Sequence, residues 1–245
     1  ILICRIFNID IIVRCNSSPS GWYHSFLKKF IYKKIISKAS AVIVNSIDFK
    51  KEMENNFKIK VDCIFNPLNK KEINQMAKKK SKESFFEKNK SLKILNIGRL
   101  TDQKDQITIL RAINILKQNT NVRLIIMGRG QEEGNLINFI NENKLNKFVK
   151  IKSYSENPYN LIKKTDIFIL SSRYEGLPNV LLEAATLKKF IISTKCPTGP
   201  REILCDGKGG YFFKIGDHIE LSKKIKLFLK NKKILKEKIL LTYKN

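Results

Sequence analysis

Two glutamates, Glu175 and Glu183, lie on either side of a Gly-Leu-Pro turn in the stretch SSRYEGLPNVLLEAATLKKF, residues 171–190. Pro178 suits the first position of a helix, because the N–H group that proline lacks would have no partner there. The stretch predicts a helix from this turn to Leu187, with Glu175 just before it and Glu183 one to two turns inside. The simpler explanation is that Glu175 complements the helix dipole and that Glu183 is a solvated surface side chain.

The chemistry that this stretch favours is the binding of a polyol that carries phosphate. Main-chain amides at the start of a helix have no partner within the helix, so they can face an anion. Pro178 has no N–H to donate. The remaining candidate donors are the amides of Gly176, Leu177, Asn179 and Val180. The two carboxylates can accept paired hydrogen bonds from the hydroxyls of a ribose or a hexose.

Two cations follow an earlier apolar run, in the stretch LKILNIGRLTDQK. Gly98 permits a tight turn, Arg99 comes directly after it, and Lys104 is expected about one turn into the next helix. Two cations beside the partly positive start of a helix form an anion site that suits a diphosphate. The alternative is that Arg99 pairs with a surface acid and that Lys104 is merely solvated.

The other candidate motifs indicate no further chemistry. Gly128, Gly130 and Gly134 miss the G-x-G-x-x-G spacing by one residue, so a dinucleotide site is not expected. His24 is expected to be a packed or surface residue rather than a base. The sequence has no Ser-His-Asp order, no P-loop motif and no zinc-type spacing among its five cysteines and two histidines, so we expect reduced thiols, no metal and no cofactor.

The elements that position these residues follow an alternating pattern. Short runs rich in Ile and Val alternate with amphipathic helical stretches, which predicts an α/β fold with a doubly wound parallel sheet. Strands are expected at 9–13, 41–44, 61–65, 92–98, 122–128, 148–151, 166–172, 190–193 and 210–213. Helices are expected at 22–39, 46–55, 109–116, 136–143, 158–164 and 176–187, with a short one after Gly199 and a Lys-rich one over 221–244. Ligands of such sheets bind outside the carboxyl ends of the strands, where the candidate residues lie.

The domain organisation is indicated by a polar, Lys-rich stretch that interrupts this pattern. We expect a partial N-terminal Rossmann-like domain at 1–68, a linker with one helical turn at 69–90 and a complete C-terminal domain at 91–245. Any hinge between the domains is expected within 67–91.

The formal net charge of +26 suggests a nucleic acid or an anionic membrane as a partner. Lys supplies nearly all of this charge, whereas base and phosphate recognition favours Arg, so specific nucleic-acid binding is not expected. The closing stretch 221–244 has nine Lys and one Glu, and it suits either contact with anionic lipid or core packing with a solvated Lys face. No apolar run is long enough to span a bilayer, and charged residues interrupt the N-terminus, so we expect no signal peptide.

Three stretches in this order resemble the retaining glycosyltransferases of family 4, which have the GT-B architecture of two facing Rossmann-like domains. They are NIGRLTDQK, NPYNLIKKTDIFILSSRYEGLPNVLLEA and ISTKCPTGPREIL, and the resemblance extends over about 9–230. It implies that Arg99 and Lys104 hold the donor diphosphate, that Glu175 orients the donor sugar, and that these three residues are catalytic. The donor-binding residues that it implies are Gly98, Gly176, Leu177, Asn179, Val180 and Glu183, of which Glu183 binds the nucleotide ribose.

The resemblance also implies the reaction and its partners. The donor is a nucleoside-diphosphate sugar, the acceptor is a glycan or a lipid-linked saccharide, and no metal is needed. The expected function is hexosyl transfer in bacterial cell-surface polysaccharide or lipopolysaccharide synthesis, in the cytoplasm or at the inner face of the cell membrane, with peripheral contact to anionic lipid. The departing phosphate helps to deprotonate the acceptor hydroxyl.

Three departures from the family pattern leave a second hypothesis open. The first strands and the glycine-rich loop of the N-terminal domain are missing, the chain stops before the helix that crosses back to that domain, and Asp105 stands where many relatives have Gly. We therefore expect a truncated chain. The second hypothesis is a non-catalytic remnant that binds the sugar nucleotide without turnover.

Overall fold

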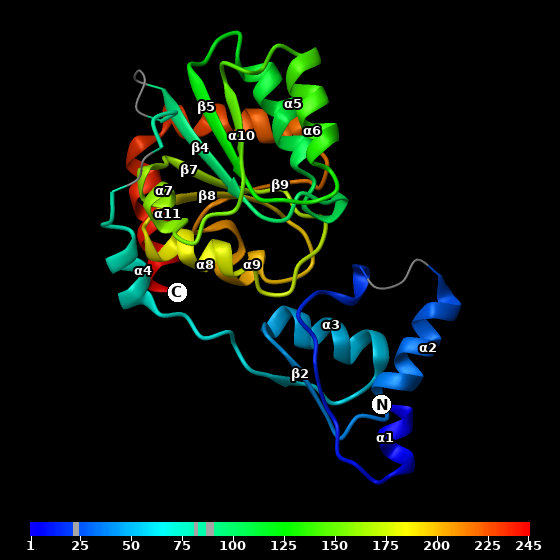
Figure 1. Cartoon of the computed structure of the whole chain (residues 1–245). Coiled ribbons are helices and arrows are strands. Elements are labelled where there is room, and N and C mark those ends of the chain that lie inside the picture. The colour runs from blue at the N-terminus through cyan, green and yellow to red at the C-terminus, as the bar shows by residue number, and fades with distance from the viewer. Residues whose placement is uncertain (22–24, 81–82, 87–90) are drawn as a thin grey trace. The chain divides into compact units, whose positions relative to one another are not determined.

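The computed structural model describes residues 1–21, 25–80, 83–86 and 91–245 of the chain. These residues form two compact units, which are described separately (Figure 1). Unit 1 comprises Ile1–Pro67 and two loops, Tyr174–Pro178 and Cys196–Glu202. Unit 2 comprises Leu68–Arg173, Asn179–Lys195 and Ile203–Asn245. His24, and with it the start of the helix expected over 22–39, lies outside the described residues.

Unit 1 contains a parallel sheet of three strands in the order β1-β2-β3. Its elements are α1 (Leu2–Ile6), β1 (Ile12–Arg14), η1 (Pro19–Gly21), α2 (Phe26–Ile36), β2 (Ala41–Val44), α3 (Ile47–Phe57) and β3 (Asp62–Cys63). Phe49, Met53 and Phe57 recur every four residues on α3 and are fully buried, so this face packs in the core of the unit. Val44 of β2 belongs to the same core.

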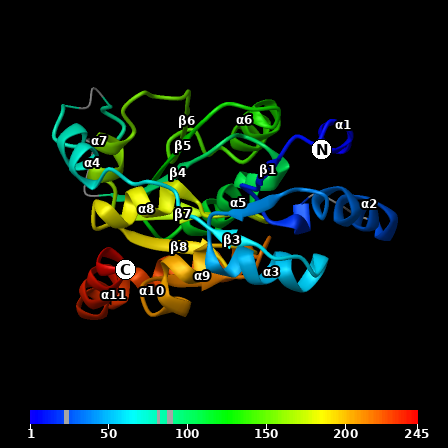
Figure 2. The same cartoon turned by 90° about the horizontal axis from the view of Figure 1, so that it is seen from below.

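Unit 2 contains a six-stranded parallel sheet in the order β6-β5-β4-β7-β8-β9. Its strands are β4 (Leu92–Ile97), β5 (Val122–Met127), β6 (Val149–Lys152), β7 (Ile167–Leu170), β8 (Phe190–Thr194) and β9 (Tyr211–Phe213). Figure 2 shows β6, β5, β4, β7 and β8 side by side. Numbered within the unit, this order is 3-2-1-4-5-6, the doubly wound Rossmann order. All residues of β7 and β8 are buried, as is expected for central parallel strands covered on both faces.

The helices of unit 2 form two groups on opposite faces of the sheet (Figure 1). The helical elements are α4 (Lys70–Met76), η2 (Asp102–Lys104), α5 (Gln106–Leu116), α6 (Glu133–Glu142), α7 (Tyr159–Lys164), α8 (Asn179–Thr186), α9 (Pro200–Ile203), η3 (Cys205–Gly207), α10 (His218–Lys230) and α11 (Lys232–Lys244), with α9 crossing the border between the units. Helix α5 contacts α6 and α10, whereas α8 contacts α4, α7 and α11. The predicted apolar face of α5 is confirmed, because Ile109, Ala112, Ile113 and Leu116 are all fully buried.

The closing Lys-rich stretch forms two helices, not the single one expected. Asn231 separates α10 from α11 with φ −125° and ψ 56°, values outside the helical region. Leu221 and Ile225 of α10 and Leu235 of α11 belong to the core of unit 2. Of the two explanations for this stretch, the structure therefore favours core packing with an exposed Lys face. In the described part of the chain, no helix is long and apolar enough to span a bilayer.

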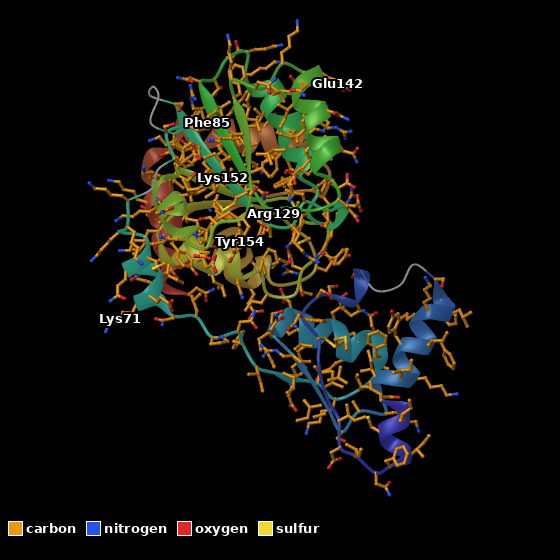
Figure 3. The ribbon with its side chains drawn as sticks, in the orientation of Figure 1. Lys71, Phe85, Arg129, Glu142, Lys152 and Tyr154 are labelled. Carbon is orange, nitrogen blue, oxygen red and sulfur yellow. The ribbon has the colours of Figure 1, made fainter. Side chains whose placement is uncertain are left out.

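The segment before β4 belongs to unit 2, which differs from the linker expected over 69–90. The Glu83 carboxylate is 2% exposed and accepts hydrogen bonds from Lys150 Nζ at 3.0 Å and Lys152 Nζ at 3.2 Å. Phe86 is 1% exposed. Figure 3 labels Lys152 at the end of β6. A buried carboxylate that neutralises two lysines attaches this part of the segment to the sheet, so it is not a free linker.

Candidate functional site

The carboxyl ends of β4, β5 and β6 lie level with one another. Gly98 N donates to Met127 O at 3.0 Å, and Gly128 N donates to Lys152 O at 2.9 Å. A Cβ atom on Gly128 would lie 1.9 Å from Gly98 O, so only glycine permits this approach of the two main chains. Gly130 is similar, since its Cβ would lie 2.2 Å from Leu100 O. These glycines serve main-chain packing, which explains why they do not follow a dinucleotide-binding spacing.

The two predicted cations lie in the loop that follows β4. Arg99 is exposed and donates to Gln103 Oε1 at 3.3 Å. The side chain of Lys104 lies over Gly98, where a Cβ would be 3.5 Å from Lys104 Cδ. Lys104 lies one turn into a helix, but that helix is the short 3-10 helix η2 and not α5. It ends η2, and α5 begins only at Gln106.

Asp105 separates η2 from α5 in the left-handed conformation, with φ 49°. This conformation favours glycine, the residue that the family resemblance implies at this position. The side chain is buried. Its Oδ2 accepts from Thr108 Oγ1 at 2.8 Å, and its Oδ1 lies 3.6 Å from Arg173 NH2. Burial raises the pKa of Asp105, although Thr108 and Arg173 oppose this effect. The negative charge expected near the anion site is therefore paired within the fold.

Glu183 lies in the second turn of α8, which begins at Asn179, one residue after Pro178. The N–H groups of Asn179 and Val180 are in the first turn, where amides have no partner within the helix. Burial raises the pKa of Glu183 to about 7, and a hydrogen bond from the Tyr159 hydroxyl opposes this rise. Glu183 is therefore a half-buried carboxylate, not a solvated surface side chain.

Hydrogen bonds join the loop after β4 to the end of β7, the strand that precedes α8. Ser171 Oγ donates to Lys104 O at 2.6 Å, and Arg173 N donates to Gln103 O at 2.8 Å. Strands β4 and β7 are neighbours in the sheet. The Gly98–Lys104 loop is thus bonded to the carboxyl end of the strand that leads to α8, the helix that carries Glu183.

The other three predicted residues lie in unit 1. Glu175 is 7% exposed, its N–H donates to Pro197 O at 2.6 Å, and its carbonyl accepts from Ser18 N at 2.6 Å. A Cβ on Gly176 would lie 2.3 Å from Asn16 O, so this position also requires glycine. Leu177 is buried.

The main chain of this loop retains donors for a ligand. Within the described part of the chain, the N–H groups of Gly176 and Leu177 donate to no protein acceptor. The carbonyl of Gly176 is already engaged, since it accepts from Thr198 Oγ1 at 3.1 Å. The predicted amide donors are therefore available, whereas Gly98, another predicted donor-binding residue, uses its N–H in the sheet.

Sequence reasoning singled out none of four further polar residues. Tyr159 is the first residue of α7, and its presence in the stretch NPYN was the only signal in the sequence that could have pointed to it. Arg129 follows β5 and Tyr154 follows β6, and Figure 3 labels both at the end of the sheet. In unit 1, Glu202 Oε2 accepts a hydrogen bond from Ile47 N at 2.9 Å at the start of α3. This contact joins residues far apart in the sequence, so no local pattern indicates it.

The described residues contain no group of three or more His, Cys, Asp or Glu that could hold a metal ion. The groups available to an anionic ligand are cations and main-chain amides. The arrangement in unit 2 is that of a Rossmann-type α/β protein with cations and a carboxylate at the carboxyl edge of its sheet.

The comparisons with known proteins identify the family. The family model described as glycosyl transferases group 1 matches residues 77–239, and the chain belongs to this family. An uncharacterised glycosyltransferase of Methanocaldococcus jannaschii is 33% identical over 218 residues, which is 84% of this chain and 54% of the relative. N-acetylgalactosamine-N,N'-diacetylbacillosaminyl-diphospho-undecaprenol 4-alpha-N-acetylgalactosaminyltransferase of Campylobacter jejuni is 28% identical over 254 residues, which is 100% of this chain and 66% of the relative.

Solved structures show the same fold. The Anabaena protein HepE, in complex with UDP-glucose, superposes with a TM-score of 0.81 at 18% identity, covering 99% of this chain and 70% of HepE. The predicted α/β fold class of GT-B type is thereby confirmed. The chain spans between about half and two thirds of the length of the two curated relatives described above.

Proposed function

We propose that this chain contains the donor-binding part of a retaining glycosyltransferase that uses a nucleoside-diphosphate sugar. One observation carries the proposal: in unit 2, the loop with Arg99 and Lys104 is bonded to the end of β7, which leads to Glu183 on α8. Cations suit the diphosphate, and a carboxylate suits the hydroxyls of the ribose. Family membership and the UDP-glucose in HepE support this class of donor.

The proposed chemistry needs only groups that the chain supplies. The bond between the sugar and the diphosphate breaks while the acceptor oxygen bonds to the same face of the sugar carbon, and the acceptor proton passes to the departing phosphate oxygen. Within unit 2, Arg99 and Lys104 stabilise the charge that develops on the diphosphate, a role that a metal has in other enzymes. Glu175 orients the hexose.

The acceptor that we propose is a glycan or lipid-linked saccharide of bacterial surface polysaccharide or lipopolysaccharide synthesis. The Campylobacter jejuni relative is named for an acceptor on diphospho-undecaprenol, which supports a lipid-linked substrate. Such an acceptor places the reaction at the inner face of the cell membrane.

Calorimetric titration with UDP and GDP tests the donor site. We expect the chain to bind one of the two nucleotides, and Arg99→Ala to weaken binding at least tenfold, because a hydrogen bond to a charged group contributes about 1.5–3 kcal/mol. The control is Lys147→Ala, which removes an exposed cation from the loop before β6 and leaves affinity unchanged. Binding of neither nucleotide by the unaltered chain overturns the proposal.

A different measurement distinguishes the second hypothesis, a remnant without turnover, from an active enzyme. A chain that binds nucleotide but neither transfers sugar nor hydrolyses the donor is the remnant, whereas transfer or donor hydrolysis identifies the enzyme.

Contact with an anionic membrane is supported by helix α2. Phe26 is 86% exposed and Phe30 is 53% exposed, and only Ile36 of this helix is buried. The same helix carries Lys28, Lys29, Lys33 and Lys34. Exposed aromatic rings beside lysines suit insertion among anionic headgroups.

Sedimentation with phosphatidylglycerol vesicles tests this contact. We expect Phe26→Ser to weaken vesicle binding about tenfold without changing the charge of the chain, because a buried Phe contributes about 1.5–3 kcal/mol. Ile137→Ser on α6, also at an exposed apolar residue, is the control. Equal binding by the two variants shows that only the net positive charge attracts the chain to the vesicles.

A further inference from the structure

Two adjoining hollows lie on the surface of unit 2, on the side where Figures 1 and 2 show α4, α7, α8 and α11. The first has a volume of about 260 Å³ and the second a volume of about 470 Å³. Both are lined by Ala77, Lys78 and Lys163, so they form one continuous surface, which we call the cationic groove. Volumes of this order are those of small-ligand sites.

The charge of the cationic groove comes from lysine side chains. In the described part of the chain, six lysines line it: Lys78, Lys79, Lys80, Lys163, Lys164 and Lys188. None of the described lining residues is Asp or Glu. A cleft lined by charges of one sign concentrates ions of the opposite sign, so this groove attracts anions.

The ends of three helices account for only part of this charge. Helix α4 ends at Met76, α7 ends at Lys164 and α8 ends at Thr186, so each has lysines of the groove at or just after its carboxyl end. The carboxyl end of a helix carries about half a negative charge, so three ends together carry about one and a half. Set against six lysines, this leaves an excess of about 4.5 positive charges.

The walls of the groove are held by bonds between its helices. Asn157 Nδ2, just before α7, donates to Met76 O at the end of α4, with a distance of 3.0 Å. Lys189 Nζ, after α8, donates to Lys163 O near the end of α7. Helix α8 also contacts α4 and α11. The main chain that carries the lysines is therefore fixed, and the charges are brought together by the fold itself.

The aliphatic lining of the groove argues against a bilayer as its occupant. Membrane-binding surfaces insert exposed aromatic or aliphatic side chains among the headgroups, as proposed above for Phe26 on α2. Where the lining is described, its aliphatic residues are Ala77, which is buried, and Leu187, which is half-buried. Neither provides such an anchor.

The aromatic lining argues against a single-stranded nucleic acid, whose bases stack on exposed rings. Tyr243 of α11 is the one aromatic residue among the described lining residues. Its ring is already contacted, because Lys188 Nζ lies 4.5 Å and Lys70 Nζ lies 5.9 Å from the ring centre. The groove thus presents ammonium groups, each a compact charge with three N–H donors, which suit phosphate oxygens.

The cationic groove is separate from the proposed donor site. Helix α8 begins at Asn179, at the carboxyl edge of the sheet, whereas Lys188 lies beyond its other end, two residues before β8 begins at Phe190. Eight helical residues span about 12 Å. The groove therefore lies toward the amino edge of the sheet, and Arg99 and Lys104 follow the carboxyl end of β4.

We propose that the cationic groove is a second anion site of unit 2, which binds a soluble, compact anion with several phosphate groups. Lys78 and Lys163 are central to it, because they line both hollows. The proposal does not depend on the proposed function, since it uses none of the residues assigned to the donor site.

Calorimetric titration with sodium tripolyphosphate tests this site. In 150 mM NaCl, charges more than about 8 Å apart are largely screened, so the overall positive charge of the chain contributes little. We expect the unaltered chain to bind, and the double variant Lys78→Gln, Lys163→Gln to bind at least tenfold more weakly. Both side chains are exposed, so the variant should fold. Tripolyphosphate should also raise the midpoint of thermal unfolding of the unaltered chain but not that of the variant, because a ligand stabilises the folded state that binds it.

The matched control is Lys223→Gln, Lys226→Gln on α10, which removes two exposed lysines outside the groove and changes the net charge equally. It should bind tripolyphosphate as the unaltered chain does. Equal losses in the two double variants would mean that only the overall charge matters, which overturns the proposal. Undiminished binding by the groove variant, or no binding by the unaltered chain, also overturns it.

Two further arms distinguish the other occupants of a basic surface. Sedimentation with phosphatidylglycerol vesicles and filter binding of a single-stranded RNA are measured for both double variants. We expect both variants to behave alike in these two assays. If the groove variant alone loses vesicle or RNA binding while its affinity for tripolyphosphate is unchanged, the groove serves a membrane or a nucleic acid and the proposal is wrong.

Discussion

Gly128→Ala is expected to lower the free energy of unfolding by about 3 kcal/mol, the upper part of the usual range for overpacking. The new methyl carbon would lie 1.9 Å from Gly98 O and 2.9 Å from Gly98 C, and both are main-chain atoms that cannot turn aside. To accommodate it, the ends of β4 and β5 must separate where Gly98 N donates to Met127 O. Urea unfolding followed by circular dichroism measures the change. Because Gly98 begins the loop with Arg99, nucleotide affinity should fall as well.

Gly134→Ala is the matched control, since this glycine lies six residues further along. It is the second residue of α6, and a Cβ there would meet nothing within 4 Å. Alanine in a helix is more favourable than glycine by about 0.5–1 kcal/mol, so this variant should be slightly more stable than the unaltered chain. Similar stability changes in the two variants would refute the assignment of Gly128 to close main-chain packing.

Glu183→Gln is expected to make the fold more stable at pH 8 while weakening nucleotide binding. Burial raises the pKa of Glu183 from its ordinary 4.5 to about 7, so the folded state holds the proton more tightly than the unfolded state. The free energy of unfolding therefore falls as the pH rises from about 4.5 to about 7, and it stays lower above that range. Glutamine does not titrate, so the variant lacks this fall. Allowing for partial exposure, we expect a gain of about 2 kcal/mol at pH 8.

Two measurements check this combination of effects. Urea unfolding should show the variant more stable at pH 8 and nearly equal to the unaltered chain at about pH 3.5, where the carboxyl is largely neutral in both states. Calorimetry should show at least a tenfold loss of nucleotide affinity, because the amide cannot replace an ionised acceptor. A stability difference that is the same at both pH values would mean that ionisation of Glu183 is not its cause. Stability lost for the sake of binding is common at functional sites.

Much of the fold could be predicted from the sequence, because its signal is local. The face formed by Ile109, Ala112, Ile113 and Leu116 repeats at helical spacing, and the apolar run of β7 is typical of a central parallel strand. The break at Asn231 could not be predicted, since the apolar spacing continues on both sides of it. The attachment of Glu83 to β6 depends on lysines 67 and 69 positions away, and a local pattern carries no such information.

The candidate site could be predicted from the sequence only in part. Arg99, Lys104 and Glu183 could be proposed because each follows a recognisable strand, and such positions meet at one edge of a parallel sheet. Tyr159 was missed because a single tyrosine at a helix start is only a weak signal. Asp105 was expected to disturb the anion site. Its left-handed conformation instead turns the carboxylate toward Thr108 and Arg173, which depends on the folded backbone.

The short segment around Glu83 determines where the chain can be cut. It covers one face of β5 and β6, where Lys150 and Lys152 share the Glu83 carboxylate and Arg123 stacks on the Phe85 ring with 4.8 Å between the guanidinium carbon and the ring centre. A fragment that started at residue 91 would uncover a strip of sheet carrying three uncompensated cations and the apolar surface beneath Phe86. A fragment that started at Leu68 keeps this cover, so it is the better choice for producing unit 2 as a well-behaved, crystallisable protein.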